Sequence, residues 1–228
     1  MIIAKALTPP QKLAHEWSLD NRNNEGSNPV ISSYMPKNIP ISSRKNRAAV
    51  LICIFSGPDG ELRVILTRRS MKLSSHPGDV ALPGGKTDEG DADDSATALR
   101  EAMEEIGLDP GLIRVNLLTV VPVIGILSNV GDFKPVLNAD EVDAIFDAPL
   151  EMFLQEDGHK CVEKEWEGWK YACHIFELEA EQGNFVVGGL TASILIHAAS
   201  IIYQRSPTFN QNLQDFSQLQ STLNLLNN

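Results

Sequence analysis

One short segment, residues 100–108, constrains this chain more than any other. It reads Arg-Glu-Ala-Met-Glu-Glu-Ile-Gly-Leu, and on a helix of about 3.6 residues per turn it places Glu101, Glu104 and Glu105 on one face. Stacked like charges cost roughly 0.2–0.5 kcal/mol per exposed pair, and a dication removes that penalty. Clustered carboxylate oxygens suit hard ions such as Mg²⁺ or Mn²⁺. The segment therefore predicts a metal-binding helix, with a solvated acidic stripe as the alternative.

The flanking residues predict how this helix begins, packs and ends. The three residues from Asp93 to Ser95 offer N-cap side chains, so we expect a helix over about 93–106. The face opposite the glutamates is apolar, and we expect it to pack against a sheet. It holds Leu99, Met103 and Ile106. Gly107 is free to take a positive φ and is predicted to be the C-cap, while Arg100 is placed to pair with Glu104.

The segment resembles the signature of the Nudix hydrolase family, Gly-x5-Glu-x7-Arg-Glu-(apolar)-x-Glu-Glu-x-Gly-(apolar). Arg100 to Leu108 agree with it at every defined position. The resemblance implies an α/β (α+β) fold, a Nudix-type α/β/α sandwich with a mixed sheet. It also implies that Glu101, Glu104 and Glu105 bind Mg²⁺ or Mn²⁺, and that Arg100 completes the catalytic set by orienting these glutamates.

The upstream half of the signature departs from this pattern. Its glutamate would fall at Ala92 and its glycine at Lys86, and the stretch from Gly85 to the arginine is one residue longer than the general signature. Asp91 is the nearest substitute for the missing carboxylate, and Glu89 is another. An extension of this kind after Pro-Gly-Gly-Lys-x-Asp is typical of the subfamily that includes coenzyme A diphosphatases.

A second motif, ILTRRSMKLSSHPGDVALPGG at residues 65–85, resembles the same subfamily. The matching positions are Leu66, Thr67, Arg69, Ser70, Gly78, Pro83, Gly84 and Gly85. Ser74 stands where an arginine is usual and Leu82 where a phenylalanine is usual, so Arg68 and Lys72 are candidates to replace the lost phosphate partner. The resemblance implies a set of substrate-binding residues. They are Arg69, Ser70, His76, Gly84, Gly85 and Lys86.

Together the two motifs imply metal-dependent hydrolysis of coenzyme A or its derivatives to 3′,5′-ADP and 4′-phosphopantetheine. A metal-bound water would be the nucleophile, and its proton would pass to one of the helix glutamates or to Glu141, which follows Asn138-Ala-Asp. Another nucleotide, such as oxidised dGTP, NADH or ADP-ribose, is an alternative substrate. The segment 109–120 is shorter than the resemblance implies, so we expect a strand or loop fewer there. A catalytically impaired Nudix-fold binding protein therefore stays open as the other alternative.

Composition bounds the partners. A chain of 228 residues with 43% hydrophobic residues is expected to bury one core. A formal charge of −11 argues against binding a nucleic-acid backbone, and no apolar run approaches the roughly 18–20 residues that cross a bilayer. The three cysteines show no metal or disulfide spacing, and no targeting signal is recognised, so the expected location is cytoplasmic. We expect a small nucleotide substrate, and a homodimer is common in the family.

The chain divides by composition into three parts: a polar leader at 1–46, the hydrolase domain at 47–205 and a Gln/Asn-rich tail at 206–228. The domain is expected to hold a set of strands and helices in alternation. Strands are predicted at 48–56, 62–67, 80–82, 120–127 and 163–178, short helices at 140–146 and 150–154, and a closing helix at 190–203.

Overall fold

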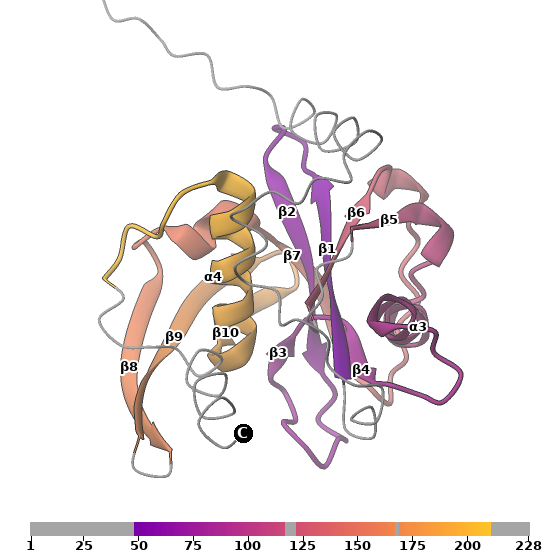
Figure 1. Ribbon diagram of the computed structural model, residues 1–228, viewed down its shortest axis with the longest axis horizontal. Coiled ribbons are helices and arrows are strands. Elements are labelled where there is room, and N and C mark those ends of the chain that lie inside the picture. The colour runs from indigo at the N-terminus through magenta and orange to yellow at the C-terminus, as the bar shows by residue number, and fades with distance from the viewer. Residues whose placement is uncertain (1–47, 117–121, 167–168, 211–228) are drawn as a thin grey trace, which may run out of the picture.

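The structure is a computed structural model that describes residues 48–116, 122–166 and 169–210. A mixed sheet stands at its centre (Figure 1). Helix α3 (Asp94–Ile106) covers one face of this sheet, and helix α4 (Gly189–Tyr203) lies on the other side together with a smaller sheet. The predicted sandwich with a mixed sheet is therefore confirmed.

The central sheet runs in the order β3-β2-β1-β6-β5, with β4 beside β1 and β7 beside β2. Its strands are β1 (Ala48–Ser56), β2 (Leu62–Arg69), β3 (Val80–Ala81), β4 (Gly84–Lys86), β5 (Ile113–Asn116), β6 (Pro122–Leu127) and β7 (Val142–Pro149). β1 and β6 are parallel, with Ile52 opposite Ile124. The other pairs of this sheet are antiparallel.

Strand β1 divides the core into two halves, because successive side chains of a strand point to opposite faces. Leu51, Cys53 and Phe55 belong to the cluster beneath α3. Ile52 and Ile54 belong to the larger cluster beneath α4. A strand buried on both faces reads as a continuous apolar run, which is how 48–56 reads.

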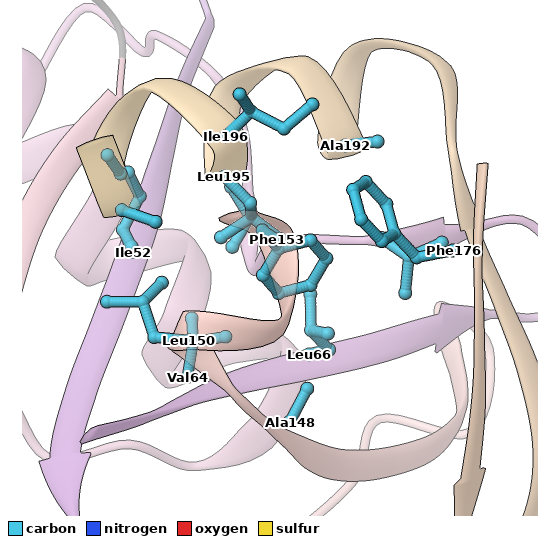
Figure 2. Close-up of a cluster of buried hydrophobic side chains, with 14 of the residues drawn as sticks. Ile52, Val64, Leu66, Ala148, Leu150, Phe153, Phe176, Ala192, Leu195 and Ile196 are labelled. Atoms are coloured by element: carbon cyan, nitrogen blue, oxygen red, sulfur yellow. The ribbon is translucent and has the colours of Figure 1, made fainter. Parts of the chain in front are cut away.

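The larger cluster joins the central sheet to the rest of the domain. The smaller sheet has the order β10-β9-β8, built from β8 (His159–Trp166), β9 (Trp169–Ala180) and β10 (Gly183–Gly188). Figure 2 shows side chains from β2, α4, β9 and the 3₁₀ helix η4 (Leu150–Leu154) gathered around Phe153. Phe153 and Phe176 meet edge to face, with ring centroids 5.0 Å apart.

The helix predicted at 140–146 is wrong. Residues 142–149 form β7 and not a helix, pairing along their length with β2, with Phe146 opposite Leu66. Val142 and Phe146 are four residues apart and both buried, a spacing that suits one face of a helix and one face of a strand alike. The predicted helix at 150–154 is confirmed as the 3₁₀ helix η4.

The segment after α3 holds a 3₁₀ turn, η2 (Pro110–Leu112), and the short strand β5, which pairs antiparallel with β6. β5 was not predicted, and residues 117–121 lie outside the described part of the chain. That a strand or loop is missing relative to the family stays a prediction. A further 3₁₀ turn, η3 (Val130–Asp132), follows β6.

The closing helix is confirmed as α4, and its inner face contributes Leu195 and Ile196 to the larger cluster. Among the residues that the structure describes, no helix combines the length and apolar character needed to cross a bilayer. The predicted leader at 1–46, residue 47 and most of the predicted tail, 211–228, lie outside the described residues. Phe209, just beyond the predicted domain boundary, is buried and stacks on His159 with centroids 3.8 Å apart.

Candidate active site

Helix α3 carries the site, and both of its predicted ends are confirmed. The Asp93 side chain accepts a hydrogen bond from the Ala96 N–H at 2.9 Å, which makes it the N-cap. At the other end Gly107 takes φ 70°, and its N–H donates to the Met103 carbonyl oxygen at 3.0 Å. This bond from the positive-φ glycine to the carbonyl four residues earlier is that of an αL cap, which stops the helix after the glutamates. The Leu108 N–H donates to the Ala102 carbonyl oxygen at 3.3 Å.

The packing face of α3 differs from the prediction at one residue. Ala98, Ala102 and Ile106 are fully buried against the sheet. Met103, expected on that face, is 49% exposed, while Glu105 is only 6% exposed. The small alanines let the helix lie close to β1. Relative to the prediction, the helix is turned about its own axis, so that Glu105 lies on the inner side and Met103 on the outer side.

Three carboxylates converge at one point, and they come from two segments. Glu101 and Glu105 of α3 meet Glu141, from the turn before β7, with one oxygen of each lying within 4.8 Å of the others. Glu104 is not part of this cluster. Its side chain is half-exposed and accepts a hydrogen bond from Arg100 Nη1 at 2.9 Å. Two of the three predicted helix glutamates are therefore brought together, and Glu141 supplies the third carboxylate.

The electrostatics of the cluster are unfavourable without a counter-charge. Burial raises the pKa of Glu105 to about 7, and the negative charges of Glu141 and Glu101 add to this effect. A hydrogen bond from the Gly84 N–H, 3.2 Å from Glu105 Oε2, and the positive charge of Arg69 partly oppose it. Burial also raises the pKa of Glu101. A dication among these oxygens would favour their ionised forms.

Arg100 is held beside the cluster by Asp91. Its Nε and Nη2 donate to the two Asp91 oxygens at 3.0 and 3.1 Å, and Nη2 also lies 3.0 Å from Glu101 Oε1. The predicted pairing with Glu104 is present as well. Asp91, which the sequence offered as the nearest substitute for the absent upstream glutamate, is thus the partner of Arg100.

The two glycines of β4 allow two close approaches, of β1 at Gly84 and of the helix residue Glu101 at Gly85. A Cβ on Gly85 would lie 2.6 Å from Glu101 Oε1, and one on Gly84 would lie 2.6 Å from the Val50 Cα. Gly84 also has φ +154°, which side chains disfavour. Only glycine at 85 leaves room for the Glu101 carboxylate in its present place.

The remaining predicted substrate residues differ in exposure and in their hydrogen bonds. Arg69 hydrogen-bonds to the Ser75 carbonyl oxygen at 3.2 Å, and Lys86 is exposed at the end of β4. His76, with φ 53°, is exposed and lies 3.2 Å from Asp79. Ser70 is fully buried and its hydroxyl donates to the Ala139 carbonyl oxygen at 3.4 Å, so its side chain supports the turn that carries Glu141.

The donor set fits a divalent cation. Oxygen ligands of one Mg²⁺ lie about 3–4 Å apart, since each sits about 2.1 Å from the ion. Small side-chain rotations would bring the three oxygens, within 4.8 Å of one another, to that spacing. The raised pKa of Glu105 marks a buried carboxyl without sufficient positive charge nearby. The site therefore suits a cation and, through it, an anionic substrate.

Comparison with known proteins places this geometry in a family. The NUDIX domain model matches residues 45–186. Two relatives in Arabidopsis thaliana are named Nudix hydrolase 15, mitochondrial, and Nudix hydrolase 22, chloroplastic. The first is 51% identical over 78% of this chain and 66% of its own length, and the second is 50% identical over 75% and 60%. The chain thus spans less than two thirds of the length of either plant relative.

A more distant relative carries a substrate in its name. The peroxisomal coenzyme A diphosphatase NUDT7 of Mus musculus is 38% identical over 72% of this chain and 73% of its own length. The expected cytoplasmic location is contradicted by these three relatives, which are named for mitochondria, chloroplasts and peroxisomes. That expectation rested only on the fact that no targeting signal was recognised, which is weak ground because organelle addresses are read by receptors and not from composition.

Proposed function

This chain belongs to the Nudix hydrolase family, and on that premise we propose that it is a divalent-metal-dependent diphosphatase acting on coenzyme A or its derivatives. The observation that carries the proposal is the convergence of Glu101, Glu105 and Glu141 beside Gly84 and Gly85 of β4. Support for the substrate comes from the motif at 65–85 and from the similarity to a mouse protein named as a coenzyme A diphosphatase.

The three converging carboxylates would hold Mg²⁺ or Mn²⁺. When bound, the ion neutralises diphosphate oxygens and lowers the pKa of a coordinated water, so that a nucleophile is present near neutral pH. Arg100 keeps the Glu101 carboxylate in the cluster through their contact at 3.0 Å. The Gly84 N–H orients Glu105 from the other side.

Arg69 and Lys86 are our candidates for substrate phosphate contacts. Arg69 is near enough for its charge to act on Glu105, and Lys86 is the last residue of β4, next to Gly85. A guanidinium matches phosphate oxygens in pairs, whereas an ammonium acts as a point charge.

The test is chromatography of the products formed from coenzyme A with Mg²⁺ or Mn²⁺, with EDTA as the metal-free control. We expect metal-dependent release of 3′,5′-ADP and 4′-phosphopantetheine. Glu105→Gln should bring turnover down toward the level of the EDTA control, because it removes one of the carboxylates that would hold the ion. Glu179→Gln, which removes the same charge from an exposed position on β9, should leave turnover unchanged.

Two other outcomes would redirect the assignment. Release of products from ADP-ribose, NADH or oxidised dGTP but not from coenzyme A would keep the chemistry and replace the substrate. No turnover of any of these by a folded protein would support the impaired binding protein.

A further inference from the structure

The turn at 138–142 brings Glu141 to α3, and Asn138 stands at its start. The Asn138 Nδ2 donates to Glu141 Oε1 at 3.1 Å, and Oδ1 accepts a hydrogen bond from the Asp140 N–H at 3.2 Å. The Asn138 carbonyl oxygen accepts from the Glu141 and Val142 N–H groups at 2.9 and 2.8 Å. One residue thus fixes the backbone of the turn and also the carboxylate that the turn presents.

Asn138 is also bonded to the helix. Its N–H donates to the Glu105 carbonyl oxygen at 2.9 Å, and the Val136 N–H donates to the Ile106 carbonyl oxygen at the same distance. Carbonyl groups in the last turn of a helix lack partners within the helix, so these two are available to the incoming chain. Asn138 therefore bridges two members of the carboxylate cluster, Glu105 through its backbone and Glu141 through its side chain.

Ser70, the residue after β2, also holds the turn, and both of its bonds go to backbone carbonyl groups of the turn. The Ser70 N–H donates to the Glu141 carbonyl oxygen at 2.8 Å, and the Ser70 hydroxyl donates to the Ala139 carbonyl oxygen. Within the described residues, the amide of Asn138 is the one hydrogen-bond donor to the Glu141 carboxylate. The orientation of the Glu141 carboxylate therefore depends on the Asn138 amide, whereas the position of the turn depends also on bonds to its backbone.

Resting on the proposed function, we propose that Asn138 is a positioning residue of the metal site. Its amide aims the Glu141 carboxylate at Glu101 and Glu105 and so sets the affinity of the cluster for a divalent ion. Partners that orient metal ligands in this way typically change metal affinity 10- to 100-fold when they are removed. An asparagine that merely stabilised a turn would change the stability of the fold and leave the metal affinity alone.

A second turn of the same build provides a matched control. Asn129 Nδ2 donates to Asp132 Oδ2 at 2.7 Å, and Asn129 Oδ1 accepts a hydrogen bond from the Gly131 N–H at 3.2 Å. These are the same two bonds that Asn138 makes. Asp132, however, is not among the converging carboxylates.

The experiment titrates Mn²⁺ into the full chain and follows the free ion by electron paramagnetic resonance, with thermal melts by circular dichroism to verify folding. We expect Asn138→Ala to weaken Mn²⁺ binding about 10- to 100-fold, and Asn129→Ala to bind Mn²⁺ as the wild type does. In a Glu141→Gln background Asn138→Ala should cause no further loss, because its target carboxylate is already absent. Should Asn138→Ala fail to fold, Asn138→Ser replaces it, since a hydroxyl still accepts from the Asp140 N–H but is too short to aim Glu141.

Three results would overturn the inference. Wild-type Mn²⁺ affinity in folded Asn138→Ala would reduce this residue to a turn stabiliser. A further loss in the Glu141→Gln background would show that Asn138 acts by another route. Absence of Mn²⁺ binding by the wild type itself would remove the proposed function together with this inference, whereas the first two results leave the proposed function standing.

Discussion

Asp91 and Arg100 form a two-pronged ion pair, Nε to Oδ1 at 3.0 Å and Nη2 to Oδ2 at 3.1 Å. The same guanidinium reaches Glu101 and Glu104, and its Nη2 donates to the Lys86 carbonyl oxygen at 2.9 Å. Paired bonds between a guanidinium and a carboxylate fix orientation as well as distance. Asp91 therefore determines where Arg100 lies, and Arg100 in turn holds the Glu101 carboxylate.

The first prediction concerns the pH dependence of this pair. Arg100, aided by bonds from the Asp88 N–H and Thr97, lowers the pKa of Asp91 to about 2. A carboxyl with a lower pKa in the folded chain stabilises the fold above its unfolded pKa, and that stability is lost as the pH falls through about 2. Asp91→Asn should lower the free energy of unfolding by about 1–2 kcal/mol at pH 7, and by less at pH 3.

Urea unfolding of both proteins at the two pH values measures this difference. A difference between wild type and Asp91→Asn that is the same at pH 7 and pH 3 would contradict the assignment of the pair.

The second prediction concerns the space beside Glu101. Gly85→Ala places a Cβ against the Glu101 carboxylate, so the carboxylate must move out of the cluster. We expect Mn²⁺ affinity and kcat each to fall about 10- to 100-fold. Gly90→Ala is the matched control, because a Cβ at Gly90 would meet nothing within 4 Å. Equal kcat values for the two variants would show that the close approach at Gly85 has no functional role.

Helix α3 was predictable because the residues that determine its ends and its ion pair are close in sequence. The N-cap at Asp93, the αL cap at Gly107 and the pairing of Arg100 with Glu104 each depend on residues within four positions. Which side of α3 faces the sheet was harder to predict. Met103 is apolar and lies outside, while Glu105 is charged and lies inside, an inversion that a functional carboxylate imposes on the ordinary pattern.

The third carboxylate depended on long-range structure. Glu141 reaches Glu105 because β7 pairs with β2 and because the Asn138 N–H bonds to the last turn of α3. Neither contact leaves a signal in local periodicity, and the four-residue spacing of Val142 and Phe146 favoured a helix there. Glu141 could be named from the sequence as a candidate general base. Its position in the cluster could not be predicted, because that position depends on these long-range contacts.

The third prediction concerns Glu105 in the metal-free protein. Burial raises the pKa of Glu105 to about 7, against 4.5 in the unfolded chain. The folded state therefore holds a proton that the unfolded state has already lost, so this group makes the fold less stable as the pH rises from 4.5 through 7. With EDTA present, Glu105→Gln should be more stable than the wild type at pH 8, by at most about 3 kcal/mol, and nearly equal to it at pH 5.

Unfolding in urea at pH 5 and pH 8 with EDTA tests the sign. Mn²⁺ should reverse the order at pH 8, since it binds the wild type more tightly and binding stabilises the folded state. A variant less stable than the metal-free wild type at pH 8 would show that the Glu105 carboxylate is already compensated within the protein.

The last prediction concerns a histidine pair far from the glutamates in the chain. His159 Nε2 lies 2.9 Å from His174 Nδ1, and the ring of Phe209 covers His159. Burial, and then the charge of His174, lowers the pKa of His159 to about 4. The unfolded chain, with a histidine pKa of 6.5, takes up protons first, so the fold loses stability as the pH falls from about 6.5 toward 4.

His159→Gln should therefore flatten the fall in stability between pH 7 and pH 5, although it weakens the fold at pH 7 by disturbing the stack on Phe209. Thermal melts at half-unit pH intervals measure the slope. If His159→Gln retained the full wild-type slope, the acid sensitivity would have to come from other groups, and the buried pair would carry no proton-linked stability.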